Sequence, residues 1–339
     1  MKAIQVKEPY QMAVIDMEKP VIDSKNNVLV KIRAAGICGS DVGIYHGTNA
    51  AAIYPRVIGH EMVGEVVEVG ENVSELKVGN RVIIDQVTNC GHCYACRKGR
   101  GNVCADLKVR GVHIDGGYRE YMAVPERDCY ILPDSLAYED AVMIEPTTIA
   151  IQCCSRAKLC SEDILVILGC GALGSSILRI AKLSGARIIV ADIIDDKLWE
   201  ALAAGADYTI NLENENFEAK VKEYTKGYGA TVSIDAACTK DSLSELMAVT
   251  GNAGRVITMG FSVSPTEINQ FSITSKELDI RGSRLQNKKF GEAIRLIEEG
   301  KLDLRGSISH RFPFMEAQKA FDFNDSKDPS IRKIVLTFD

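Results

Sequence analysis

A buried strand, a glycine-rich turn and a helix follow one another in the middle of the chain, and this succession constrains the fold more than any other feature. Asp163–Leu168 is an apolar run of strand length, Gly169–Gly174 reads Gly-Cys-Gly-Ala-Leu-Gly, and Ser175–Ser184 has the spacing of an amphipathic helix. A second apolar strand, Arg187–Asp192, comes next. Parallel strands need crossover connections of this kind, so the segment predicts a βαβ unit.

The same alternation continues as far as Gly260. The expected elements are a helix Lys197–Ala204, a strand Tyr208–Asn211, a helix Phe217–Thr225, a strand Thr231–Asp235, a helix Ser242–Thr250 and a strand Arg255–Gly260. Strands that alternate with helices over such a length form a parallel, doubly wound sheet, so we expect the α/β class.

The glycine-rich turn has the spacing of a dinucleotide-binding loop. Gly169 would make the tight turn, Gly171 would let the backbone approach a pyrophosphate, and Gly174 would allow close packing of helix on strand. The N–H groups at the start of the helix would face the phosphates, so we expect the whole loop, with Ala172 and Leu173, to bind the cofactor. The alternatives are a glycine-rich turn in an unrelated α/β sheet and a site for another nucleotide-like ligand.

The choice of dinucleotide depends on Asp192, at the end of the second strand. A carboxylate there accepts hydrogen bonds from the hydroxyls of the adenosine ribose. Ile193 and Ile194 follow it, not an arginine, so a 2′-phosphate would meet an uncompensated negative charge. We therefore expect NAD rather than NADP, and we expect Lys197 to contact the cofactor as well.

The first third of the chain consists of short apolar or alternating stretches separated by glycines, and it predicts a small twisted barrel. The clearest strands there are Asn27–Ala34, Met62–Gly70 and Arg81–Asp85. The expected domains are residues 1–148, 149–282 and 283–339. The last contains an expected helix, Lys288–Glu299, and an expected strand, Arg332–Phe338, and we expect it to return to the first domain.

Four closely spaced cysteines have the spacing of one tetrahedral zinc site: Cys90, Cys93, Cys96 and Cys104. The alternative is a pair of disulfides. No charged-then-apolar leader is visible, so we expect a cytoplasmic protein whose thiols stay reduced. We expect the remaining cysteines to be small core residues: Cys129, Cys153, Cys154, Cys160, Cys170 and Cys238.

The overall charge and hydropathy exclude two classes of partner. Forty basic and 46 acidic residues leave a net charge of −6, and without a basic stripe the chain has no electrostatic footprint for nucleic acid. No apolar run approaches the roughly 18 residues that a membrane span needs. We expect a small-molecule substrate, and a homodimer or homotetramer.

A second set of metal ligands stands upstream of the four cysteines. Cys38 lies in Gly-Ile-Cys-Gly-Ser-Asp, residues 36–41, and His60 lies in Gly-His-Glu-Met-Val-Gly, residues 59–64. A closed four-thiolate site beside an open Cys/His site suggests that zinc is used twice, once to hold a loop and once to polarise a substrate. This combination favours an enzyme.

These motifs together resemble those of the zinc-dependent medium-chain dehydrogenases, the superfamily of alcohol, sorbitol and threonine dehydrogenases. The zinc signature is matched by Gly59, His60, Glu61, Gly64, Gly70 and Val73. The four cysteines match the structural lobe and the glycine-rich turn matches the cofactor loop, so the resemblance extends to about Gly282. It implies a GroES-like β-rich catalytic domain with a Rossmann domain, two zinc ions per chain, and NAD-dependent alcohol oxidation.

The resemblance also implies roles for single residues in the open site. Cys38 and His60 would bind the catalytic zinc, and Glu145 takes the place of a third ligand found in polyol dehydrogenases. Glu61 ranks below Glu145 as that ligand, and Cys153 and Cys154 are less favoured alternatives.

The neighbouring polar residues have counterparts too. Asp41 resembles the carboxylate that fixes the tautomer of the histidine ligand, and Ser40 resembles the hydroxyl that passes the substrate proton towards solvent. Many members of the superfamily have a relay histidine where this chain has Gly43. His46 is a candidate substitute from the same loop.

Within the superfamily, residues 111–117, 143–146 and 282–285 are most similar to the bacterial sugar-acid branch, which includes L-galactonate and L-gulonate 5-dehydrogenases and RspB-like proteins. Arg284 matches an arginine that contacts substrate in sorbitol dehydrogenases, and a guanidinium suits a sugar-acid carboxylate. A surface salt bridge is the alternative role for Arg284. We expect oxidation of a secondary hydroxyl of a sugar acid to a ketone. The alternatives are a polyol, threonine or simple alcohol dehydrogenase, and a regulator that binds NAD and zinc without turnover.

Overall fold

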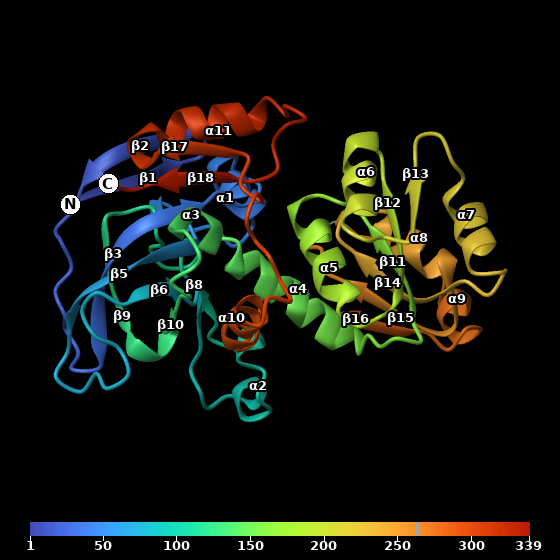
Figure 1. The fold of residues 1–339 in the computed structure, drawn as a ribbon, viewed down its shortest axis with the longest axis horizontal. Coiled ribbons are helices and arrows are strands. Elements are labelled where there is room, and N and C mark those ends of the chain that lie inside the picture. Colours follow the sequence, from blue (N-terminus) through green and yellow to red (C-terminus); the bar gives the residue numbers. More distant parts are fainter. Residues whose placement is uncertain (262–264) are drawn as a thin grey trace. The chain divides into compact units, whose positions relative to one another are not determined.

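The computed structural model describes residues 1–261 and 265–339. It divides into two compact units, shown in Figure 1: unit 1 comprises Met1–Glu145 and Phe290–Asp339, and unit 2 comprises Pro146–Lys289. The end of the chain therefore returns to the unit that its beginning forms. Residues 283–289 lie in unit 2, although the sequence led us to expect the return from residue 283. One reason is that Ser283 N donates to Thr258 O (3.0 Å), which continues the sheet of unit 2.

Unit 1 is rich in short strands. These strands are β1 (Lys2–Glu8), β2 (Gln11–Asp16), β3 (Asn27–Gly36), β4 (Arg56–Val57), β5 (Glu61–Val69), β6 (Arg81–Ile84), β7 (Val87–Thr88), β8 (Lys108–Val109), β9 (Tyr121–Pro125), β10 (Cys129–Ile131), β17 (His310–Pro313) and β18 (Ile334–Thr337). Its helices are α1 (Gly39–Tyr45), α2 (Tyr94–Arg97), α3 (Tyr138–Ala141), α10 (Phe290–Glu298) and α11 (Ala317–Asp325). Helix α4 (Ile144–Ala157) begins in unit 1 and continues into unit 2.

The strands of unit 1 form one large sheet and two small ones. The large sheet has the order β10-β6-β5-β3-β18-β17, and β9 also pairs with β3. The small sheets have the orders β2-β1-β4 and β7-β8. In the large sheet β3 lies between β5 and β18, both antiparallel to it, and Gly36 pairs with Glu61 on β5 and with Val335 on β18. Three segments far apart in the sequence therefore meet at the end of β3.

The three strands expected in the first third of the chain are present, each within two residues of its expected ends. β3 reads as a nearly continuous apolar run because side chains on both of its faces are buried, including Val28, Leu29, Val30 and Ile32. The sequence did not indicate β1, β2 or β4, which are short or carry exposed side chains on both faces.

Unit 2 is built on one parallel sheet. Its strands are β11 (Ile164–Leu168), β12 (Arg187–Asp192), β13 (Tyr208–Asn211), β14 (Ala230–Asp235), β15 (Thr250–Thr258) and β16 (Asp279–Gly282), and its other helices are α5 (Ala172–Lys182), α6 (Asp195–Ala203), α7 (Phe217–Tyr224), α8 (Ser242–Val249) and α9 (Gln270–Thr274). The strand order is β13-β12-β11-β14-β15-β16. This is the order of a doubly wound Rossmann sheet, in which successive strands are added first on one side of β11 and then, from β14 on, on its other side.

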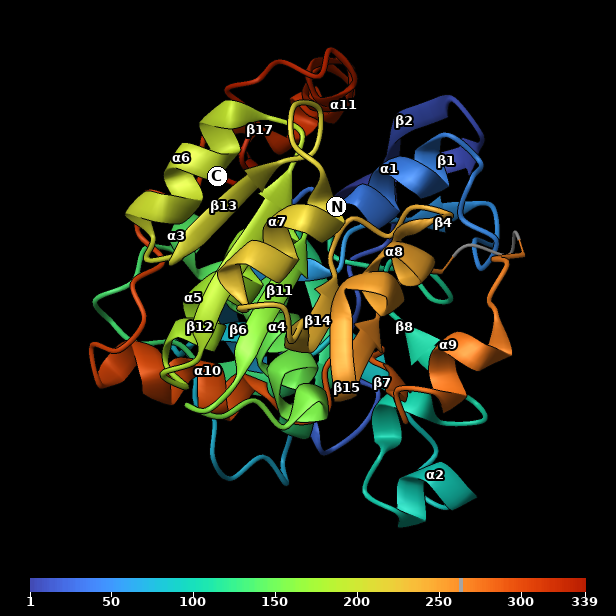
Figure 2. The same ribbon diagram turned by 90° about the vertical axis from the view of Figure 1, so that its right-hand side faces the viewer.

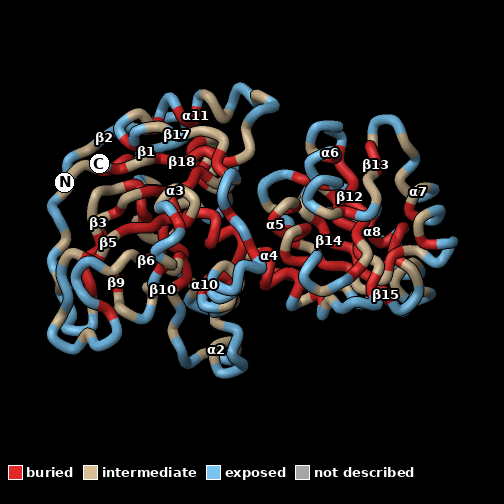
Figure 3. Tube along the Cα trace, viewed as in Figure 1, coloured by how far each residue is buried: buried red, intermediate tan, exposed pale blue. Residues whose placement is uncertain are grey.

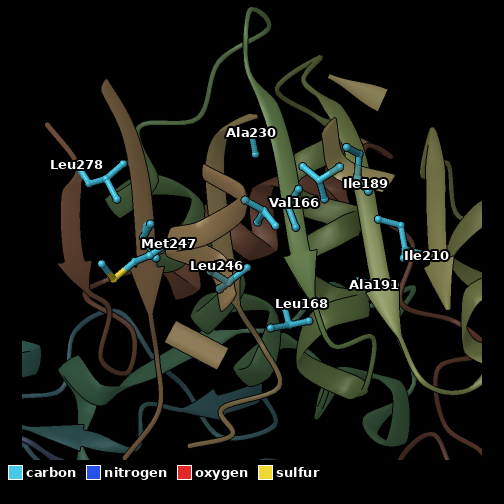
Figure 4. Close-up of a cluster of buried hydrophobic side chains, with 12 residues drawn as sticks. Val166, Leu168, Ile189, Ala191, Ile210, Ala230, Leu246, Met247 and Leu278 are labelled. Carbon is cyan, nitrogen blue, oxygen red and sulfur yellow. The ribbon is translucent and has the colours of Figure 1, made fainter. Parts of the chain in front are cut away.

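Helices cover both faces of the parallel sheet, as Figure 2 shows. One face packs against α7, α8 and α9 through the apolar cluster drawn in Figure 4, to which Val166, Ile189 and Leu246 belong. α5 and α6 contact β11, β12 and β13. β15 begins at Thr250, five residues before the expected start at Arg255, because Thr250 pairs with Ala230 ahead of an irregularity in the register.

Helix α5 shows the one-sided pattern expected of a helix that packs on a sheet. Its Ile177, Leu178 and Ala181 are buried, whereas Arg179 and Lys182 lie in the last turn, where a positive charge is favourable. In the part of the chain that the structure describes, no helix combines the length and the apolar character that crossing a membrane requires.

The expectation that six cysteines are core residues is wrong for three of them. Cys153, Cys154 and Cys170 are buried, but Cys129 and Cys238 are only partly buried and Cys160 is exposed. Cys160 lies in the turn before β11, where its N–H donates to Asp163 Oδ2 (2.9 Å). That turn leaves the thiol at the surface.

We predict that Gly59→Ala destabilises unit 1 more than Gly79→Ala does. Both glycines have a positive φ, +93° and +90°, but an added Cβ would lie 2.1 Å from the Tyr118 ring at Gly59, whereas it would meet nothing within 4 Å at Gly79. The control substitution should cost about 1–2 kcal/mol through backbone strain. Gly59→Ala should cost a further 1–3 kcal/mol, roughly, through overpacking. If denaturant unfolding showed that both substitutions lower the free energy of unfolding equally, the steric argument would be wrong.

Candidate functional site

The open Cys/His site lies at the end of β3, where α1 begins. Asp41 is fully buried there and joins the two segments that carry the candidate ligands. Its Oδ2 accepts from Cys38 N (3.0 Å) and its Oδ1 accepts from Gly59 N (3.1 Å), so one carboxylate fixes the start of α1 against the loop before β5. The Tyr118 hydroxyl also approaches Oδ2, at 3.4 Å.

His60 is oriented by the same carboxylate. Its Nδ1 lies 3.2 Å from Asp41 Oδ1, and its Nε2 lies 3.4 Å from Ser40 Oγ. Burial by itself would lower the pKa of His60, but the charge of Asp41 and the thiol of Cys38 raise it well above the usual range. A histidine that directs one nitrogen to a carboxylate and the other to a thiol and a hydroxyl has the arrangement of a metal ligand.

The structure brings together Cys38, His60 and Glu61, whose ligand atoms all lie within 4.8 Å of one another. Glu145 is not in this group, although we ranked it above Glu61 as the third ligand. The register explains the difference, because Glu61 follows His60 directly and pairs with Gly36 at the end of β3. Glu61 is therefore the carboxylate whose place in the fold puts it beside Cys38 and His60.

Glu145 lies close to this group, buried at the start of α4. Its Oε1 accepts a hydrogen bond from Gln86 Nε2, and Gln86 is itself fully buried. Burial raises the pKa of Glu145 to about 8, and the nearby charge of Glu61 acts in the same direction. Gln86 was not anticipated from the sequence.

Lys333 supplies a positive charge to the site. Its Nζ forms an ion pair with Glu61 Oε2, and the two side chains are 5% and 1% exposed. Burial tends to lower the pKa of Lys333, but Glu61 and Cys38 outweigh it and the pKa is raised. We did not anticipate Lys333 from the sequence, because it precedes the apolar residues of β18 and resembles an ordinary strand-end lysine there.

The chemistry of this donor set fits a divalent cation. A soft thiol, an imidazole and a carboxylate converge from three directions, which are ligands typical of zinc. Cys38 and Ser40 are partly exposed, whereas His60 and Glu61 are buried. The side next to Cys38 and Ser40 is therefore the one from which a substrate can approach.

Ser40 and His46 differ in their relation to the group. Ser40 Oγ donates to Cys38 Sγ (3.3 Å), so it lies against the ligands as expected. His46 instead pairs with Asp325 Oδ2 (2.8 Å) and stacks on Tyr10. These contacts hold His46 beside α11 and do not indicate a role for it in a proton relay.

The four cysteines converge in the lobe around α2. Their sulfur atoms lie within 4.8 Å of one another, with Cys104 Sγ 3.4 Å from Cys90 Sγ and 3.8 Å from Cys93 Sγ. A tetrahedral zinc with bonds of about 2.3 Å places its sulfurs about 3.8 Å apart. The N–H groups of Ala105 and Cys96 lower the pKa of Cys93 to about 6, which favours the thiolate that zinc binds.

The same lobe has little apolar material of its own. Of residues 89–104, only Asn102 and Cys104 are buried, and Figure 3 shows the exposed path of this segment around α2. A segment without a core needs another means of holding its shape, and a metal bound by four thiolates supplies one.

The glycine-rich loop of unit 2 has the three properties expected of it. Gly169 has a φ of +92°, and a Cβ at Gly174 would lie 2.0 Å from Gly169 O, so the start of α5 packs directly on the loop. At Gly171, by contrast, an added Cβ would meet nothing within 4 Å. The backbone is therefore open at the position where a pyrophosphate would approach the helix N-terminus.

Asp192 lies at the end of β12 beside this loop. Its Oδ2 accepts from Cys170 N (2.6 Å), and its Oδ1 accepts from Ile193 N (2.8 Å) and Ile194 N (3.1 Å). Asp192 thus holds the loop in place as well as presenting a carboxylate. Lys197, on α6, is close enough to help lower the pKa of the Cys170 thiol, although burial dominates and raises that pKa to about 11.

Arg284 lies in unit 2 with the cofactor loop, whereas the Cys38 group lies in unit 1. Arg284 is exposed, and its guanidinium carbon is 5.6 Å from the centre of the Phe261 ring. This cation–π contact orients a planar cation at the surface of unit 2.

Two segments of the chain match models of known protein families. Residues 24–134 match the model of the alcohol dehydrogenase GroES-like domain, and residues 172–299 match that of zinc-binding dehydrogenases. The starvation-sensing protein RspB of Escherichia coli K12 is 40% identical, with 100% of this chain and 99% of RspB covered. L-galactonate-5-dehydrogenase of the same strain is 30% identical, with 100% and 99% covered.

A solved structure extends the likeness to three dimensions. The crystal structure of the rspB alcohol dehydrogenase from E. coli CFT073, complexed with NADH, has a TM-score of 0.94 and 40% identity, and the match covers 100% of this chain and 99% of that one. The similarity spans both units and includes the segments that carry the cysteines, His60 and the glycine-rich loop. The chain therefore belongs to the zinc-dependent alcohol dehydrogenases, a family of oxidoreductases.

Proposed function

We propose that the protein oxidises a secondary hydroxyl of an open-chain sugar acid, of the L-gulonate or L-galactonate type, to a ketone with NAD as the hydride acceptor. The observation that carries the proposal is the convergence of Cys38, His60 and Glu61, a donor set that contains a carboxylate, with Glu145 buried nearby. The full-length similarity to L-galactonate-5-dehydrogenase supports the choice of substrate class.

The residues of unit 1 suit the binding of a zinc ion and the removal of a substrate proton. Zinc held by Cys38, His60 and Glu61 would act as a Lewis acid that lowers the pKa of a bound hydroxyl. Asp41 keeps the imidazole of His60 in the tautomer that presents Nε2 to the site. Ser40 Oγ, between the ligands and the exposed side of α1, is placed to accept the hydroxyl proton and pass it to solvent.

The residues of unit 2 suit NAD. The open backbone at Gly171 would accept the pyrophosphate, and Asp192 retains capacity to accept a ribose hydroxyl, because a carboxylate offers about four lone-pair sites and the protein uses three of them. We propose that Lys197 contacts the cofactor from α6 and that Arg284 pairs with the carboxylate of the substrate. A polyol dehydrogenase would share the zinc ligands, but its substrate would have no carboxylate for Arg284 to pair with.

The metal prediction concerns the two ligand sets. We expect two zinc ions per chain in the purified enzyme. Cys38→Ala should leave about one zinc and abolish turnover while the thermal unfolding midpoint changes little, because the open set lies on a folded sheet. Cys96→Ala should chiefly lower the midpoint, because the lobe around α2 lacks a core. Elemental analysis and calorimetry measure both, and an active wild-type enzyme with no second zinc would refute the assignment.

The cofactor prediction concerns Asp192. NAD should be preferred to NADP, because a 2′-phosphate would bring a dianion against this carboxylate. Asp192→Asn should narrow the preference mainly by raising the Kd for NADH, and the lone tryptophan, Trp199 on α6, offers a fluorescence signal for the titration. If the wild-type enzyme used NADP as well as it uses NAD, the proposed role of Asp192 would be wrong.

The substrate prediction concerns Arg284. A charge-assisted bidentate hydrogen bond contributes on the order of 1.5–3 kcal/mol, so Arg284→Ala should lower kcat/KM for an aldonate roughly ten- to a hundredfold. A neutral polyol of equal length should be affected little. Arg281→Ala is a suitable control, since its guanidinium already pairs with Asp279 and with a backbone carbonyl. Good turnover of sorbitol or threonine with none of aldonates would overturn the sugar-acid proposal, as would an equal effect of Arg284→Ala on both substrate types.

A further inference from the structure

We propose that Lys333 is a positioning residue that competes with the catalytic metal for Glu61 and so limits how firmly Glu61 binds that metal. The proposal rests on the proposed function, because it assigns Glu61 to the zinc site. It adds a role for the C-terminal segment, which delivers Lys333 to a site whose other members all come from the first half of the chain.

The contact between Glu61 and Lys333 has little freedom to rearrange. Lys333 Nζ meets Glu61 Oε2, and both side chains are almost fully buried. They pack over Gly36, where an added Cβ would lie 2.0 Å from Glu61 Oε2 and 2.9 Å from Lys333 Cε. The Glu61–Lys333 pair fits at this position because Gly36 has no side chain.

Glu61 consequently has two possible cationic partners. One of its oxygens lies with the ligand atoms of Cys38 and His60, and the ammonium of Lys333 engages Oε2 from the side of β18. A carboxylate shared between an ammonium and a metal ion donates less charge to the metal than one that has no other partner. The two cations also repel each other across a buried, weakly screened distance.

Sharing of the Glu61 carboxylate and repulsion between the two cations both weaken the binding of the metal. If Lys333 lowers the affinity of Glu61 for the metal, then the metal must lower the affinity of Glu61 for Lys333 by the same factor. If a metal were bound, Glu61 would be released from it more readily and would remain paired with Lys333. Lys333 therefore keeps a coordination position available, which is the property that separates a catalytic zinc from a structural one.

The test is the rate at which the zinc-loaded enzyme gives up its catalytic zinc to a chromogenic chelator. Lys333→Met should slow the release of this zinc about tenfold or more, because Glu61 then has the metal as its partner. The same variant should show a lower kcat/KM, since substrate oxygen displaces Glu61 less readily. Lys333→Arg, which keeps the charge, should restore both values towards those of the wild type.

Two further variants keep the test decisive. Lys333→Gln removes the charge but keeps a hydrogen bond to Glu61, so it covers the case in which Lys333→Met does not fold, and it should also slow zinc release. In a Glu61→Gln background the change Lys333→Met should slow zinc release clearly less, because only the direct repulsion between the ammonium and the metal is then removed. Lys276→Met is the matched control, because the Lys276 ammonium donates to carbonyls of Met247, Ala248 and Thr250 in unit 2.

Zinc release that is unchanged or faster in both Lys333→Met and Lys333→Gln would overturn the proposal, because Lys333 would then serve only to neutralise Glu61. An effect of undiminished size without the Glu61 carboxylate would overturn it as well. These outcomes are independent of the substrate. An enzyme that shows the expected release rates but oxidises no aldonate would refute the proposed substrate alone, and an enzyme with no zinc at this site would refute the proposed function.

Discussion

The carboxylates buried in unit 1 constrain the structure around them more than its apolar core does. Asp41, Glu61 and Glu145 are each 4% exposed or less. Moving an uncompensated carboxylate into such surroundings costs several kcal/mol or more, so each must have partners there. Asp41 has two backbone N–H groups and His60, Glu61 has Lys333, and Glu145 has the amide of Gln86.

The large sheet of unit 1 meets this requirement through the order of its strands. β3 lies between β5 and β18, and the pairing of Gly36 with both neighbours brings the end of one strand beside the beginnings of two others. Cys38 follows the first of these strands, Glu61 begins the second and Lys333 immediately precedes the third. Glu61 and Lys333 are adjacent because of the sheet topology, although 272 residues separate them in the sequence.

Local patterns in the sequence were sufficient for the features that depend on neighbouring residues. The four cysteines, the glycine-rich turn and the strands β11 to β15 of unit 2 each occupy one short segment, so spacing and periodicity identified them, whereas the short edge strand β16 was not predicted. The relative positions of Glu61 and Glu145 depend on strand register and on the start of α4, which no local pattern records. Lys333 and Gln86 were missed for the same reason, because each contacts its partner only through the tertiary fold.

The division of the chain also sets the order in which its parts become available during synthesis. Unit 2 is one continuous segment and can complete its sheet as soon as residue 289 has left the ribosome. Unit 1 begins before unit 2 but is completed after it, because β18, a neighbour of β3, follows unit 2 in the sequence. Until then residues 34–36 at the end of β3 lack the partner strand β18, although β9 already pairs with residues 27–31, and Glu61 lacks its ammonium. The end of β3 therefore remains an open strand edge, and the carboxylate of Glu61 remains unneutralised, until the whole of unit 2 has been translated.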